Sequence, residues 1–139
     1  ELKKQLLWDL CTRLNSGESP LSLGGSGLEL RDWTYVGDVV RALEMLAFEP
    51  ASTHDTMNIG TGVGTAVRDI ALGVVQAWHA APADDGMLTF SGKGRPGDPF
   101  SLVADPARLA GLGFEWKTPL HSGIDSFVAW FRHTTASAA

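Results

Sequence analysis

Apolar residues recur at helical spacing in several segments of the chain. Leucines stand at every fourth position over residues 2–14, and Gly17 follows them as a stop signal. Similar apolar stripes lie within residues 39–47, 67–78 and 120–131. The pattern predicts an amphipathic helix in each of these segments. A shorter helix is expected after Asp105-Pro106, which pairs an N-cap residue with proline at the first helical position.

Short runs between these segments have the composition of strands. Residues 20–23 alternate apolar and polar positions, and residues 33–36 combine aromatic with β-branched side chains. Residues 56–60 and 87–90 are similar. Helices and strands therefore alternate along the chain, which predicts an α/β or α+β fold rather than a helix bundle or a β-sandwich.

A glycine-rich loop precedes the predicted strand at residues 33–36. Three glycines within residues 24–27 permit positive φ and a close approach of the backbone to a ligand. Arg31 follows, where its planar fork of donors can bind a phosphate or a carboxylate. Asp38 is expected to be the N-cap of the next helix. On these residues alone, the alternative is a surface arginine paired with Asp32 or Asp38.

A second loop over residues 91–99 also combines glycines with cations. It can present Arg95 and backbone N–H groups to an anion, while Asp98 accepts hydrogen bonds from hydroxyl groups. The alternative is an ordinary polar turn. The glycines in residues 60–64 have Gly-x-Gly-x-Gly spacing, which does not fit a dinucleotide loop. We interpret them as a strand-to-helix turn, with Thr65 as the N-cap of the following helix.

Composition indicates one globular domain. Of 139 residues, 44% are hydrophobic and 19% charged, and the formal charge of −5 argues against nucleic acid or an acidic membrane as a partner. Cys11 is the single cysteine, which excludes an internal disulfide and fits a core position in a cytoplasmic protein. The histidines lack metal-ligand spacing, and no apolar run reaches the roughly twenty residues of a membrane span. We therefore expect neither a metal site nor a membrane anchor.

Five motifs, in order, cover nearly the whole chain. They are Gly-x-Gly-Leu-Glu-Leu-Arg-Asp-Trp-Thr-Tyr-Val-Gly-Asp-Val, Met-Asn-Ile-Gly-Thr-Gly, Gly-Arg-Pro-Gly-Asp-Pro, Ala-Asp-Pro-Ala-Arg-Leu-Ala-Gly-Leu-Gly-Phe-Glu-Trp and a final Thr-Pro-Leu…Gly-Ile…Trp-Phe helix. Together they resemble the C-terminal part of extended short-chain dehydrogenase/reductases. These are the NAD-dependent nucleotide-sugar epimerases and dehydratases, of which UDP-glucose 4-epimerase is the best-known type.

The resemblance implies that residues 1–139 form the C-terminal substrate-binding region. Its fold would be the C-terminal portion of an extended Rossmann-type epimerase, a small mixed α/β substrate domain with edge elements of the cofactor domain. Arg31 and Arg95 would grip the diphosphate of a nucleotide-diphosphate sugar, and Asp98 would lie near the ribose. Leu21 and Leu23 would offer backbone groups to the base. The resemblance also implies a homodimeric parent protein.

The sequence departs from the family in what it lacks. The Gly-x-x-Gly-x-x-Gly loop that holds NAD is not found, and Tyr35, the only tyrosine, is followed four positions later by Val39 rather than lysine. The chain also begins at Glu1, without methionine, inside a helical pattern. We therefore expect a fragment whose N-terminal NAD-binding half is absent.

Such a fragment would be inactive alone in the interconversion of nucleotide-sugars by transient oxidation with NAD. It would also expose the apolar surface that meets the missing half. The alternatives are a non-catalytic module that binds a nucleotide or nucleotide-sugar, and a structural fragment.

Overall fold

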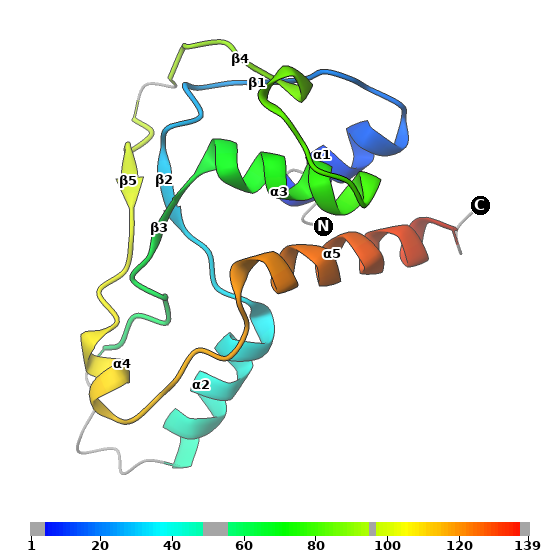
Figure 1. Cartoon of the computed structure of the whole chain (residues 1–139). Coiled ribbons are helices and arrows are strands. Elements are labelled where there is room, and N and C mark those ends of the chain that lie inside the picture. The colour runs from blue at the N-terminus through cyan, green and yellow to red at the C-terminus, as the bar shows by residue number, and fades with distance from the viewer. Residues whose placement is uncertain (1–4, 49–55, 95–96, 137–139) are drawn as a thin grey trace.

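The computed structural model describes residues 5–48, 56–94 and 97–136, whose elements form two adjoining groups (Figure 1). One group holds the helices α1 (Leu6–Asn15), α3 (Val67–His79) and α5 (Leu120–Ala136), the strands β1 (Leu21–Leu23) and β4 (Leu88–Phe90), and the 3-10 helix η2 (Asp85–Met87). The other holds the strands β2 (Leu30–Asp32), β3 (Gly64–Ala66) and β5 (Ser101–Leu102) and the helices α2 (Val36–Phe48) and α4 (Ala107–Gly111).

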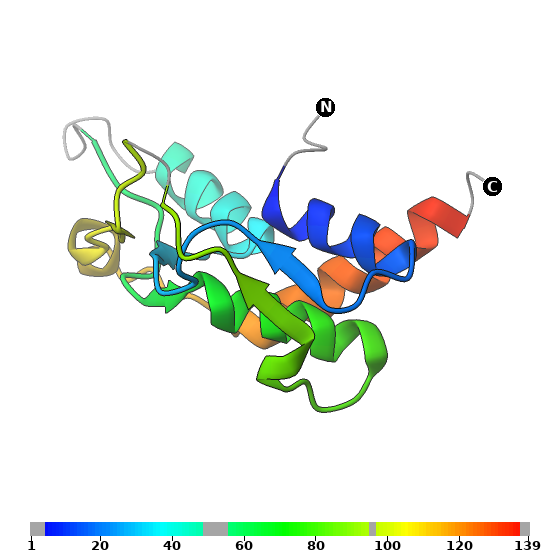
Figure 2. The ribbon, with the colours of Figure 1, turned by 90° about the horizontal axis from the view of Figure 1, so that it is seen from above.

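Each group contains one small sheet. β1 and β4 run parallel and side by side, with Leu21 opposite Leu88 and Leu23 opposite Phe90 (Figure 2). The second sheet has the order β3-β2-β5, in which β2 is antiparallel to β3 and parallel to β5. Both sheets pair segments that lie far apart in the sequence. None of the described helices is long and apolar enough to cross a membrane.

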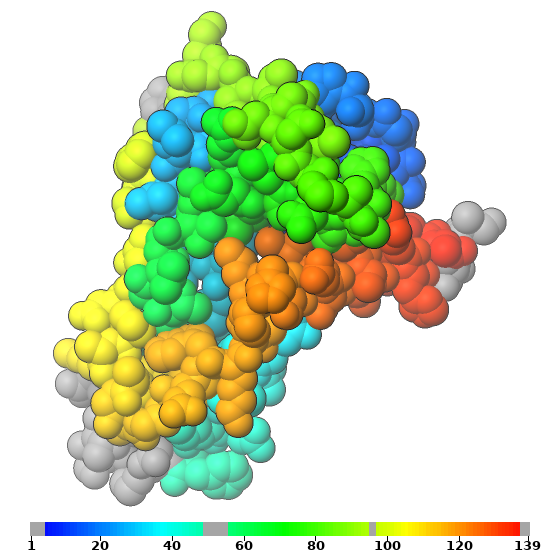
Figure 3. Space-filling view, viewed as in Figure 1, coloured from blue at the N-terminus to red at the C-terminus, as the bar shows by residue number. Residues whose placement is uncertain are grey.

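The main core lies between α1, α3 and α5, with β1 and β4 against it. Figure 3 shows α5, coloured orange to red, lying along α3 on this side of the molecule. Most of the described residues of the predicted apolar stripes are buried or half-buried here, although Leu120 at the start of α5 is 37% exposed. Trp8 meets the ring of Phe131 edge-on at 4.8 Å between centroids. Cys11 is fully buried in the same cluster, which confirms the core position expected for it.

A smaller core joins α2 to α4 and to the chain beyond α4. Ala42, Leu109 and Phe114 form its buried centre. The guanidinium of Arg41 lies 5.1 Å from the centre of the Phe114 ring, so a cation–π contact adds to the apolar packing. The expected burial of the apolar stripe in residues 39–47 is wrong in part, because α2 turns Val40 and Leu43 towards solvent, 56% and 55% exposed.

Two predicted strands are displaced in the structure. The strand expected at residues 33–36 lies at Leu30–Asp32, and α2 already begins at Val36. The strand expected at residues 56–60 is wrong, because those residues have no regular structure and β3 starts at Gly64. In both cases the available pairing partners decide the position of the strand, and aromatic or β-branched composition does not. Thr65 lies inside β3, so it is not the N-cap of α3.

Candidate functional site

The two glycine loops singled out in the sequence lie against each other. The Gly25 N–H donates to the Lys93 carbonyl at 3.1 Å, and the Gly92 N–H donates to the Gly25 carbonyl at 2.9 Å. These hydrogen bonds continue the β1–β4 pairing past the end of both strands. Gly27 has a φ of +80°, and a Cβ there would lie 2.8 Å from the ring of Phe90. Glycine is therefore required at this position.

Glu29 holds the first loop in shape. Its carboxylate accepts hydrogen bonds from the N–H groups of Ser26 at 2.8 Å and Gly27 at 2.9 Å. The bond from the Ser26 N–H is the main reason why the pKa of Glu29 lies below its ordinary value. The loop is thus closed by a side chain of its own and presents a fixed shape beside the second loop.

Arg31 lies in the middle of β2, close to the end of the second loop. Its Nη1 donates to the Leu30 carbonyl at 2.8 Å and, at 3.5 Å, to the carbonyl of Phe100. Phe100 in turn accepts the Leu30 N–H at 2.7 Å. The surface ion pair considered as an alternative is not found among the described residues, because Asp32 and Asp38 have other partners. Among the described residues, the fork of Arg31 donates only to carbonyl oxygens, and no carboxylate there neutralises its positive charge.

The other predicted site residues lie in or beside the same loops. Asp98 is exposed in the second loop, one residue after Gly97, which has a φ of +88°. Leu21 and Leu23 have buried side chains on β1, and the Leu23 carbonyl already accepts the Ser91 N–H at 3.0 Å. Arg95 lies outside the described residues, so its role stays a prediction.

From the sequence, Asp32 was considered only as a possible partner of Arg31. In the structure it accepts more hydrogen bonds than any other described carboxylate near this site. It accepts the Thr61 N–H at 2.9 Å, the Thr61 hydroxyl at 2.7 Å, the Gly62 N–H at 2.9 Å and the Ala104 N–H at 3.2 Å. Burial alone raises the pKa of Asp32, but these four hydrogen bonds outweigh it and leave the pKa below its ordinary value.

The glycines of residues 60–64 are explained by this carboxylate. A Cβ on Gly60 would lie 2.4 Å from the Cβ of Ala104 and 2.7 Å from Oδ2 of Asp32. The N–H groups of Thr61 and Gly62, which a bound phosphate would need, are already used by Asp32. The run therefore serves the protein's own packing. The signal in the sequence was an acidic residue directly before a predicted strand, together with two closely spaced glycines.

Asp38 is buried inside α2 and is not the N-cap that was predicted. It is 2% exposed, forms an ion pair with Arg41 and accepts the N–H groups of Lys117 at 3.3 Å and Thr118 at 3.0 Å. Burial raises the pKa of Asp38, while the hydrogen bonds from Thr118 and Lys117 and the charge of Arg41 bring it below its ordinary value. The residue holds α2 against the segment that leads into α5, and its partners lie in α2 and in that segment rather than in either loop.

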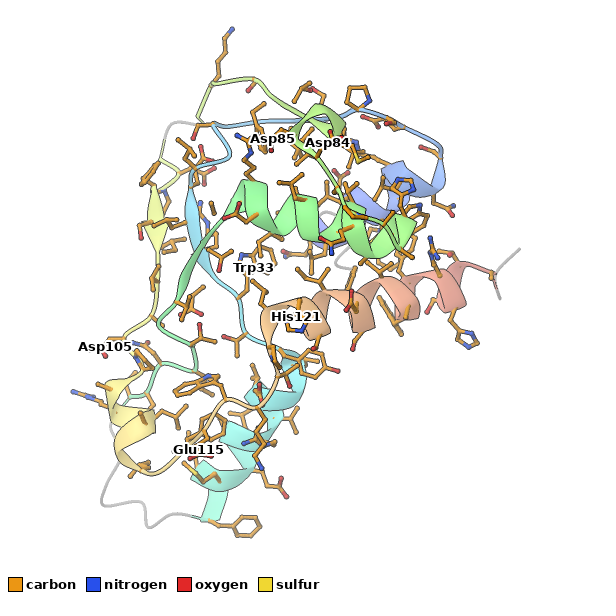
Figure 4. All side chains as sticks on the ribbon, in the orientation of Figure 1. Trp33, Asp84, Asp85, Asp105, Glu115 and His121 are labelled. Atoms are coloured by element: carbon orange, nitrogen blue, oxygen red, sulfur yellow. The ribbon has the colours of Figure 1, made fainter. Side chains whose placement is uncertain are left out.

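A well-defined pocket lies elsewhere in the described part of the chain. It has a volume of about 580 Å³ and is lined by the segment before α2, by α5 and by one residue of α1. Trp33, labelled between α3 and α5 in Figure 4, contributes its ring, and its buried Nε1 has no hydrogen-bond partner among the described residues. None of the described residues that line this pocket is charged. It therefore offers nothing to neutralise a diphosphate, and we place the candidate site at Arg31 and the two loops.

Comparison with known proteins agrees with the resemblance seen in the motifs. A family model for the NAD dependent epimerase/dehydratase family matches residues 2–60. A putative GDP-L-fucose synthase 2 of Oryza sativa subsp. japonica is 30% identical over 132 residues, which cover 88% of this chain and 34% of the relative. An uncharacterized UDP-glucose epimerase, YtcB, of Bacillus subtilis (strain 168) is 28% identical over 115 residues, covering 81% of this chain and 34% of the relative.

Solved structures match the fold over nearly the whole chain. A UDP-glucose 4-epimerase of Thermotoga maritima, solved with UDP-glucose, has a TM-score of 0.74 and 30% identity, covering 94% of this chain and 40% of its own. MoeE5 in complex with UDP-glucose and NAD has a TM-score of 0.78 and 29% identity, covering 97% and 44%.

The chain belongs to the NAD dependent epimerase/dehydratase family.

Within this family the chain has the mixed α/β fold of a C-terminal portion, as the motifs predicted. It spans about a third of the length of the curated relatives it matches, 34% and 31% for the first two. The residues present do not fit NAD themselves. The sequence has no Gly-x-x-Gly-x-x-Gly run, and the glycine run before α3 holds Asp32 instead. NAD is the cofactor expected of a member of the family, but no step involving it can be assigned to this chain.

Proposed function

We propose that this chain is the substrate-binding part of an NAD-dependent nucleotide-sugar epimerase or dehydratase. The observation that carries the proposal is the position of Arg31, a half-buried cation that lies against the Phe100 carbonyl, just beyond the second of two hydrogen-bonded glycine loops. A cation whose planar fork has no carboxylate partner among the described residues suits a diphosphate. Solved relatives of similar fold that carry UDP-glucose support the same ligand class.

In the proposed complex each predicted residue has one role. Arg31 and Arg95 bind the diphosphate, Asp98 accepts hydrogen bonds from the ribose, and the backbone around Leu21 and Leu23 approaches the base. Arg31 provides charge-assisted hydrogen bonds of roughly 1.5–3 kcal/mol in total. Its replacement should therefore weaken binding by about tenfold or more.

Calorimetric titration tests the proposal. UDP-, GDP-, CDP- and dTDP-sugars are titrated into the 139-residue chain and into the longest form that its gene encodes. We expect one of them to bind the longest form, and Arg31→Ala and Arg95→Ala each to weaken that binding at least tenfold. Arg132→Ala is the matched control, because Arg132 is an arginine of α5 whose guanidinium lies over the ring of Trp78 in α3, away from both loops. Binding that is unchanged in Arg31→Ala would remove this residue from the site.

The second candidate is a non-catalytic module that binds a nucleotide or nucleotide-sugar, and it is favoured by the lack of a Tyr-x-x-x-Lys pair in the sequence. This module would bind the ligand as the 139-residue chain alone, with the affinity of the longest form. The enzyme proposal expects the short chain to be inactive and to bind more weakly. A structural fragment would bind none of the sugars.

The enzyme proposal also includes a homodimeric, cytoplasmic parent protein. Its support is the family resemblance together with the lone, fully buried Cys11, which suits a reducing compartment. Sedimentation of the longest form checks the dimer, and a monomer at micromolar concentration would contradict it.

A further inference from the structure

Asp32 connects three segments that are distant in the sequence. It lies at the end of β2, and its carboxylate binds the turn at Thr61 and Gly62 and the N–H of Ala104, which is 72 residues away. Ala104 follows β5 by two residues. The carboxylate therefore fixes the end of β5 to the end of β2.

β5 needs such an anchor because the strand itself is short. It comprises only Ser101 and Leu102, paired with Leu30 and Arg31 of β2. A ladder of two residue pairs provides few backbone hydrogen bonds and holds its register weakly. The contact between the Leu30 N–H and the Phe100 carbonyl fixes one end of β5, and Asp32 fixes the other.

Arg31 depends on the position of β5. Its Nη1 approaches the Phe100 carbonyl, so a shift of β5 along β2 would move the group against which the guanidinium rests. Asp32 is next to Arg31, and successive side chains of a strand point to opposite faces of the sheet. Asp32 can therefore set the geometry around Arg31 without lying on the face from which Arg31 would meet a ligand.

We propose that Asp32 is a positioning residue, whose carboxylate fixes β5 against β2 and so holds the Arg31 guanidinium in the geometry that binds the diphosphate of a nucleotide-sugar. The inference rests on the proposed function of Arg31. Both oxygens of Asp32 accept hydrogen bonds, Oδ1 from Thr61 and Oδ2 from Gly62 and Ala104. Asparagine cannot replace this set, because its NH₂ group would face an N–H donor.

The test uses the longest form that the gene encodes, with UDP and UDP-glucose as calorimetric probes. We expect Asp32→Asn to weaken both by about tenfold. Thr61→Val removes one hydroxyl at nearly constant shape and should weaken the binding of both probes by a few fold. Thr61→Ser keeps the hydroxyl, and this variant should bind both probes as the wild type does. Asp69→Asn is the control, since Asp69 is an exposed aspartate of α3.

A double variant separates positioning from general destabilisation. If Asp32 acts through Arg31, adding Asp32→Asn to Arg31→Ala should change the affinity by less than twofold. The proposal would be overturned if the losses of affinity in the two single variants multiply in the double variant. It would also be overturned if Asp32→Asn lowers the melting temperature but leaves the affinity for both probes unchanged. If Asp32→Asn does not fold, the Thr61→Val and Thr61→Ser pair decides by the same criteria.

The outcomes also separate this inference from the proposed function. Wild-type protein that binds neither probe nor any other nucleotide-sugar overturns both. Wild-type binding that is lost in Arg31→Ala but intact in Asp32→Asn and Thr61→Val overturns only the role of Asp32.

Discussion

The carboxylate of Asp38 accepts the main-chain N–H of Thr118 at 3.0 Å across 80 residues of sequence. The same carboxylate pairs with Arg41, whose Nη2 donates to the Glu115 carbonyl at 2.8 Å. Four polar groups thus satisfy one another where α2 meets the segment that leads into α5. This arrangement makes α2 part of the fold although much of its apolar surface faces solvent.

Replacement of Asp38 by alanine should lower the free energy of unfolding by about 2–4 kcal/mol. The loss leaves the N–H groups of Lys117 and Thr118, which are partly buried, and the charge of Arg41 without their acceptor. Urea unfolding measures the change, and Glu44→Ala, at an exposed position of the same helix, should have no measurable effect. A loss of about 1 kcal/mol or less, as for a simple N-cap, would contradict the network.

Stability should fall steeply in acid. Asp32 and Asp38 both have a pKa lowered in the folded protein, so each contributes stability that is present above its unfolded pKa of about 4 and is lost as the pH falls through its folded pKa. Urea unfolding between pH 7 and 2 measures this. The free energy should change little above pH 5, and Asp38→Asn should show a shallower fall below pH 4. If the free energy of unfolding falls equally steeply with pH in the variant and the wild type, Asp38 does not contribute to the acid sensitivity.

Two glycine-to-alanine substitutions should have opposite effects. Gly60→Ala places a Cβ at 2.4 Å from Ala104 and should cost about 1–3 kcal/mol. Gly111→Ala, in the last turn of α4, meets no atom within 4 Å and should be neutral or stabilise by up to about 1 kcal/mol. Thermal unfolding of the pair checks both. A tolerated Gly60→Ala would mean that the turn around Asp32 is looser than the structure shows.

Cys11 should report on global unfolding. Burial raises the pKa of its thiol to about 11, although the nearby charge of Arg132 lowers it in part, and the side chain is fully buried. A chromogenic disulfide reagent at about pH 8 should react only as fast as the core opens, and at once in urea. Rapid reaction of the native protein would show that α1 separates from α3 and α5 locally.

The helices of the main core could be predicted from the sequence, because each buries one apolar stripe in the same core cluster. The stripe in residues 39–47 misled because α2 has apolar residues on its exposed side and a charged residue, Asp38, on its buried side. Hydrophobic periodicity shows which residues share one face of a helix. It does not show which other elements pack against that face. The buried carboxylate became understandable only with Arg41, Lys117 and Thr118 in place.

The site was predicted at the level of loops and not at the level of contacts. Glycines and arginines marked both loops, but the hydrogen bonds between Gly25, Gly92 and Lys93 join positions that no sequence spacing connects. The strand that was predicted at residues 33–36 and found at Leu30–Asp32 has the same explanation, because its position depends on strands distant in the sequence. Trp33 and its neighbours have a better strand composition than Leu30–Asp32, yet only the latter has β3 and β5 beside it.

The pairing of β2 with β5, and of α1 with α3 and α5, also constrains how the chain is made. Synthesis proceeds from the N-terminal side, so β2 emerges roughly 70 residues before its parallel partner, and α1 emerges long before α5, which ends at Ala136. Neither group of elements can close until its last helix, α4 or α5, has been synthesised. Folding of this region should therefore follow translation of its last helix, and a nascent chain stalled before α5 would be a substrate for chaperones.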